Sequence, residues 1–95
     1  MLPESRIPTH PGEVLRDQFL EPLGLTQVAL AEHLGVPVQR INELVRGKRR
    51  VSSETAWLLV QAFDTTPEFW LNLQTNHDLL TNRPERSIPP LRKTG

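Results

Sequence analysis

The stretch QVALAEHLGVPVQRINELVR, residues 27–46, decides the fold of this chain. Gly35 stands at one sharp corner of the stretch, and glycine adopts the left-handed backbone angles of a tight turn at little steric cost. Ala31 supplies the small side chain needed where two helices touch. Apolar or small residues recur on both sides of the corner at helical spacing, at Leu30, Ala31, Leu34, Val36, Ile41 and Leu44. The stretch therefore predicts two short helices joined by a tight turn.

Such a pair is the helix-turn-helix unit, whose second helix lies in the major groove of DNA. The charges of the chain agree with this interpretation, although the formal net charge is zero. Residues 40–50 carry five lysines and arginines against Glu43 alone, and residues 51–82 carry four acidic residues and no lysine or arginine. Because the local field decides where a phosphate backbone docks, the basic segment favours DNA over the alternative of an ordinary solvated helix face.

Signals of helix start and stop predict an all-α, compact five-helix bundle. The first helix should run from about Pro11 to Phe19 or Leu20, closed by Pro22 and Gly24; the second should follow Thr26 and end at Leu34; the third should run from about Pro37 to Arg46; the fourth should be capped by Ser52 or Ser53; the fifth should open at Thr66 and Pro67 and fray near Leu80. We expect residues 1–9 to be irregular, residues 10–81 to form a helix-turn-helix DNA-binding domain, and residues 82–95 to be a flexible tail.

The outward face of the third helix carries the side chains expected to read DNA. On a helical wheel Ile41 and Leu44 point inward, and polar residues point outward. Side-chain amides can pair with adenine, arginine with guanine, a carboxylate with cytosine and a valine methyl with thymine, whereas Arg40 on the flank suits a phosphate. The predicted DNA-binding residues are Gln27, Val38, Gln39, Arg40, Asn42, Glu43, Arg46, Lys48, Arg49 and Arg50. The alternative is that these are ordinary solvent-facing residues.

The fifth helix carries more apolar surface than one stripe against a small core requires. A single helix-turn-helix reads only a few base pairs, so such domains usually pair on two half-sites. We therefore predict a homodimer through the fifth helix, with an interface of Trp70, Leu73, His77 and Leu80. The alternative is that Trp57 and Trp70, the only tryptophans, both belong to the core.

Other function classes find little support. The chain has no cysteine for a disulfide or a thiolate metal site, and no apolar run near the ~20 residues of a membrane span. Its start lacks a hydrophobic signal core, so we expect a soluble, cytoplasmic chain. His10, His33 and His77 lack metal-site spacing, and Ser52 and Ser53 are better explained as helix caps than as nucleophiles. We predict no catalytic residue, no metal, no cofactor and no enzymatic activity.

Two longer stretches carry a family resemblance: HPGEVL at residues 10–15, and LGLTQVALAEHLGVPVQRINELVRGKRRVSSETAWLLVQAFDTTPEFWLNLQ at residues 23–74. Together they resemble the HigA-type antitoxins of bacterial toxin–antitoxin modules, within the Xre/Cro group of repressors. The resemblance covers roughly residues 8 to 80 and implies a lambda-repressor-like fold. It also implies DNA contacts at Gln27, Val38, Gln39, Arg40, Asn42 and Arg46. Position 64 departs from the family pattern, since members often have glycine where this chain has Asp64.

The resemblance implies two linked activities. An antitoxin of this type binds and neutralises a HigB-type toxin, a RelE-fold ribonuclease that cleaves ribosome-bound messenger RNA. As a dimer it also binds the operator of its own operon and represses transcription. The toxin surface has two candidates, the N-terminal segment with the first helix and the basic, proline-containing C-terminus. A protein that cleaves RNA should carry a positive face, so we favour the acidic N-terminal segment and first helix. The alternatives are a stand-alone Xre-type repressor with no toxin partner, and a protein-docking module that does not bind DNA.

Overall fold

Five helical stretches joined by short loops form the computed structural model, which describes residues 9–91. The first stretch is continuous and consists of α1 (Pro11–Val14), the π-helical η1 (Leu15–Leu20) and α2 (Glu21–Leu23); it is followed by α3 (Gln27–Leu34), α4 (Val38–Val45), α5 (Ser53–Ala62) and α6 (Pro67–Thr81). No strand occurs in the described part of the chain. The predicted all-α, five-helix fold is confirmed.

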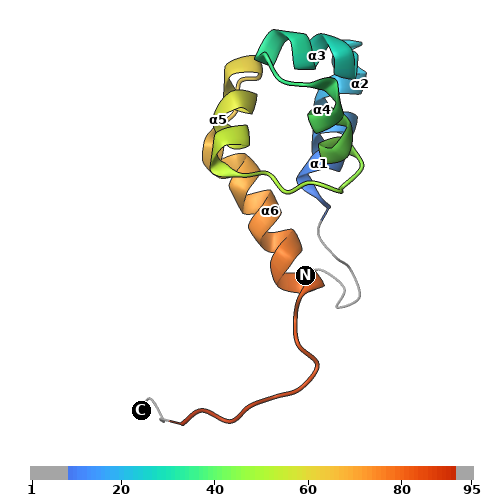
Figure 1. Cartoon of the computed structure of the whole chain (residues 1–95). Helices are drawn as coiled ribbons and strands as arrows, with labels where there is room; N and C mark the ends of the chain where they lie inside the picture. The colour runs from blue at the N-terminus through green and yellow to red at the C-terminus, as the bar shows by residue number, and fades with distance from the viewer. Residues whose placement is uncertain (1–8, 92–95) are drawn as a thin grey trace.

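The helices enclose a single core and leave an extended C-terminal segment outside it. The α3 helix packs against both α4 and α5, and α6 packs against α5. The α1 segment contacts α4 and α6, which closes the bundle. Beyond α6, residues 82–91 run away from the bundle without regular structure and are exposed (Figure 1). The predicted irregular segment 1–9 lies almost wholly outside the described residues.

The first helical stretch extends three residues further than predicted, because Pro22 does not end it. Proline in a helix lacks an N–H group and crowds the carbonyl four residues earlier. The turn before Pro22 is π-helical, and the Glu21 N–H donates to the Arg16 carbonyl five residues back. This wider turn changes the spacing of the carbonyls ahead of the proline ring. The helix passes Pro22 and ends at Gly24, whose φ is 63°.

Local capping residues set the other helix boundaries as predicted. The Thr26 side chain accepts a hydrogen bond from the Ala29 N–H at 3.0 Å. Ser52 and Thr66 cap α5 and α6 in the same way. Gly35 forms the predicted corner with a φ of 73°. Pro37 is the residue before α4 rather than part of its first turn.

Trp70 lies at the centre of the core and is completely buried. Its Nε1 donates to the Thr65 hydroxyl at 2.8 Å, and its ring lies 5.3 Å from that of Phe19. The prediction that Trp70 belongs to a dimer interface is therefore wrong, because the folded monomer leaves none of its surface for a partner. Trp57 does not share this core position and remains 60% exposed.

A close contact joins the first helical stretch to α4. Gly12 packs so tightly that a Cβ atom at this position would overlap the Leu44 carbonyl oxygen. His10 is buried at the start of α1, where its Nδ1 accepts a hydrogen bond from the Gly12 N–H at 2.9 Å. The His77 ring lies edge-on to the His10 ring at 5.0 Å, which connects this junction to α6. The start of α1 thus contacts both the end of α4 and α6.

Candidate nucleic-acid interface

The α4 helix presents a strongly two-sided surface. Ile41 and Leu44 are 2% and 1% exposed and point into the core, as predicted. Val38 and Gln39 at the start of the helix and Arg46 at its end are exposed. A short amphipathic helix held in this way after a glycine corner has the geometry of a recognition helix.

Gln27 and Asn42 link the two helices of the unit. The Asn42 amide donates to the Gln27 Oε1 at 3.2 Å, and both residues are only partly exposed. Gln27 begins α3, where the first backbone N–H groups have no partner inside the helix. This end of α3 can therefore donate to a phosphate next to the surface that α4 presents.

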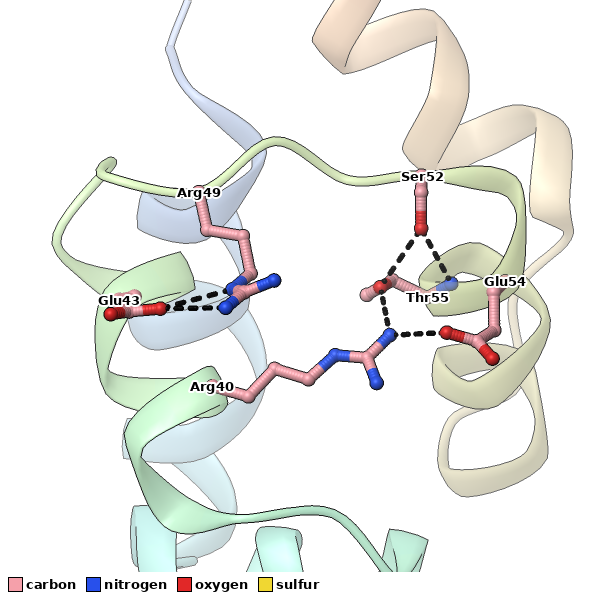
Figure 2. Close-up of polar contacts among 6 residues, drawn as sticks. All are labelled: Arg40, Glu43, Arg49, Ser52, Glu54 and Thr55. Carbon is pink, nitrogen blue, oxygen red and sulfur yellow. Dashed lines mark hydrogen bonds and ion pairs between the residues drawn. The ribbon is translucent and has the colours of Figure 1, made fainter.

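Arg40 is partly buried, and its guanidinium group is bonded across to α5. Its Nη2 lies 2.8 Å from Glu54 Oε1 and 2.9 Å from the Thr55 hydroxyl, both on α5 (Figure 2). Thr55 is itself bound by the Ser52 hydroxyl at 3.2 Å. The Arg40 side chain is only 23% exposed, and it ties the recognition helix to the first turn of α5. The phosphate contact of Arg40 stays a prediction, and in this structure its partners are a carboxylate and a hydroxyl group.

Glu43 forms an ion pair with a cation of the loop that follows α4. Arg49 donates from Nη2 and Nε to Glu43 Oε1, at 2.8 and 3.1 Å (Figure 2). Gln39 reaches the other carboxylate oxygen at 3.3 Å. An ion pair at this level of exposure stabilises the fold by about 0–1 kcal/mol, so that a DNA phosphate can compete for Arg49.

The remaining cations after α4 differ in their surroundings. Arg50 pairs with Asp78 on α6, and hydrogen bonds from Arg50 and Gln74 hold the pKa of the Asp78 carboxyl below its usual value. Arg46 and Lys48 are exposed, and within residues 9–91 neither of them forms an ion pair. These two cations project into solvent beside the outer face of α4.

Sequence reasoning missed the acidic and hydroxyl partners of these arginines. Glu54 and Thr55 lie 14 and 15 residues from Arg40, and Asp78 lies 28 residues from Arg50. No local spacing pattern marks contacts of that range.

The predicted interface residues Leu73 and His77 on α6 are partly exposed, and Leu80 is 39% exposed.

The described residues give no sign of other site classes. None of their helices is long and apolar enough to cross a membrane. Between residues 9 and 91 no three histidine, cysteine, aspartate or glutamate side chains are placed to hold a metal ion.

Comparisons with known proteins agree with a DNA-binding surface. A family model described as helix-turn-helix matches residues 17–70. Virulence-associated protein I of Dichelobacter nodosus is 49% identical over 70 residues, which make up 74% of this chain and 65% of that protein. Antitoxin HigA-1 of Vibrio cholerae is 42% identical over 79 residues, 83% of this chain and 74% of that protein. The structure of the Pseudomonas aeruginosa antitoxin HigA with the higBA promoter has a TM-score of 0.81 and 40% identity, and covers 90% of this chain and 99% of that one.

Proposed function

The chain belongs to the HigA-type antitoxins of the helix-turn-helix family, and we propose that it neutralises a HigB-like RNA-cleaving toxin and represses its own operon as a dimer. Members of this family are DNA-binding regulators, and the chain is not an enzyme. The proposed targets are operator DNA and a toxin that acts on ribosomes. A protein that binds both would act in the cytoplasm.

One observation carries the repressor half of the proposal: the outer face of α4 projects Gln39 and Arg46 into solvent while its inner face is fully buried. Arg46 can pair with guanine, and the Gln39 amide with adenine. Val38 adds an exposed methyl surface for thymine. Asn42 and Glu43 are partly exposed on the same face and hold hydrogen bonds that fix their neighbours.

The backbone contacts would come from the edges of this face. Lys48 already projects into solvent, and Arg49 can exchange its carboxylate partner for a phosphate. Gln27 is the first residue of α3, and the backbone N–H groups at this end of the helix would donate to a phosphate. Arg40 and Arg50 are engaged with Glu54 and Asp78, so that their first role is to position the recognition helix and the segment after it.

The dimer would form through the outer surface of α6. Leu73 and His77 are partly exposed there, and Leu80 lies further along the same helix. Leu79 is 66% exposed and widens the apolar surface. A pair of recognition helices about 34 Å apart would reach two half-sites on one face of the duplex.

Co-expression with the neighbouring reading frame tests both halves. One protein is tagged, and the purified material is assayed for the other and for binding to a fragment of its own promoter. A stable complex that also retards the promoter supports the proposal. Promoter binding with no companion protein supports a stand-alone repressor, and a companion protein without promoter binding rules out the DNA half.

A further inference from the structure

An apolar groove of about 300 Å³ opens between α3 and the end of α5. Leu23 lines it from the end of α2 and Leu25 from the α2–α3 connection. Ala29 and His33 line it from α3, and Ala62 and Phe63 from the end of α5. All of these except His33 are apolar. Leu23 at the mouth is 64% exposed, a large apolar surface for one side chain at the edge of a concave site. We call this site the α3–α5 groove.

The α3–α5 groove lies away from the contacts that hold the recognition helix. Glu54, which binds Arg40, is in the first turn of α5, whereas Ala62 ends that helix. Eight residues of helix separate the two by about 12 Å. A partner seated in the groove therefore does not displace the contact between α4 and α5.

The surroundings of the groove are acidic. All lining residues come from two segments, residues 17–39 and 51–82, that contain no lysine or arginine. Three exposed carboxylates, Glu21, Glu32 and Asp64, stand within two residues of lining positions. Within residues 9–91 none of the three forms an ion pair. The groove thus has a mostly apolar lining whose neighbours in the sequence are acidic, and we call Glu21, Glu32 and Asp64 the acidic rim of the groove.

These features select a basic partner over a second copy of this chain. In a two-fold dimer the same patch faces itself, which would bring the two acidic rims together. A protein that binds and cleaves RNA carries a positive surface, which such a rim attracts. Neutralisation requires that the antitoxin contacts that protein. The groove offers an apolar surface for this contact, and its acidic rim is complementary to the positive charge of the toxin.

We propose that the α3–α5 groove receives an apolar side chain from the basic surface of the RNA-cleaving toxin. The inference rests on the proposed antitoxin function and names the surface that carries it out. Charge alone led us to expect the toxin surface on the acidic first helix. The groove enlarges that expected surface to a site shared by α2, α3 and α5. A central apolar anchor inside a charged rim is the usual composition of a protein-binding hot spot.

The test measures the affinity of the full chain for the purified toxin by calorimetry. Leu23→Arg and Ala29→Arg place a cation in the groove and should weaken the toxin complex at least tenfold. Ile88→Arg is the matched control, since Ile88 is 70% exposed and lies outside the bundle. It should bind toxin like the wild type. Promoter binding by all three variants should equal that of the wild type, which shows that each is folded.

The outcomes separate the two proposals. If the wild type binds no toxin, the antitoxin function fails and the groove inference fails with it. If the wild type binds and both groove variants bind equally well, the groove inference is overturned while the antitoxin function stands. Loss of the homodimer by the groove variants, with toxin affinity kept, would overturn it in favour of a second copy. Weakening by Ile88→Arg alone would assign the toxin surface to the C-terminal segment.

Discussion

Replacing Gly12 with alanine sets two physical effects against each other. Glycine in a helix is up to about 1 kcal/mol less favourable than alanine, so helix propensity alone predicts that Gly12→Ala stabilises the protein. The structure predicts the opposite, because the new Cβ would overlap the backbone carbonyl oxygen of Leu44. A backbone oxygen in the middle of a packed interface cannot rotate aside as a flexible side chain can.

The expected cost follows from what must move. Overpacking by one methyl group costs about 1–3 kcal/mol in a well-packed site. Moving α1 away from α4 would also loosen Val14 and Leu15, which are 6% and 0% exposed. Because the overlapping atom belongs to the backbone, we take the upper part of that range, about 2–3 kcal/mol. Subtracting the propensity gain of up to about 1 kcal/mol leaves a net loss of about 1–2 kcal/mol. In a domain of this size each kcal/mol lowers the thermal midpoint by about 4–8 °C.

Thermal and urea unfolding, followed by circular dichroism, measure this effect. Gln18→Ala, an exposed position in the same continuous helical stretch, is the control and should change stability by less than about 0.5 kcal/mol. A rise in the midpoint for Gly12→Ala would refute the tight junction between α1 and the recognition helix.

Three further predictions concern charge, hydrogen bonding and pH. Lys48→Ala should weaken operator and scrambled duplexes alike and reduce the salt slope of binding by about one; a loss confined to the operator would make Lys48 a base reader. Gln74→Ala should destabilise the fold by about 1–3 kcal/mol in urea titrations, since Gln74 Oε1 accepts the buried Val51 N–H at 2.8 Å; a neutral result would mean that this N–H finds another partner. Burial and the neighbouring His77 lower the pKa of His10, so the unfolded chain protonates first and stability should fall as pH drops below about 6.5. His10→Asn keeps a cap acceptor without titrating and should flatten that pH dependence; an unchanged profile would assign it to other groups.

The parts of the fold that the sequence predicted are those decided within a few residues. Thr26, Ser52 and Thr66 cap helices by binding N–H groups three positions on, and such bonds follow from residue type and spacing. Gly35 marks the corner because few other residues tolerate its backbone angles. Asp64, which replaces the family's usual glycine, needs no such angle, since among residues 9–91 only glycines have positive φ.

The parts that could not be predicted depend on packing between distant segments. The π turn in η1 lets the first helix pass Pro22, a residue whose intrinsic tendency is to end it. Trp57 and Trp70 both occupy helices, and only the assembled bundle decides that Trp70 is enclosed and Trp57 is not. The partners of Arg40 and Arg50 were ambiguous for the same reason, because several acidic residues compete for each cation until the helices are in place.

The most direct test of the central claim, that α4 reads DNA sequence, compares wild type with Arg46→Lys at fixed salt. Lysine keeps the charge but lacks the planar fork that pairs with guanine. Fluorescence anisotropy would give affinities for the promoter fragment and for a scrambled duplex of the same composition. We predict that operator affinity falls about tenfold or more while affinity for the scrambled duplex is unchanged. Equal affinities of both proteins for both duplexes would show that this face of α4 does not read the sequence.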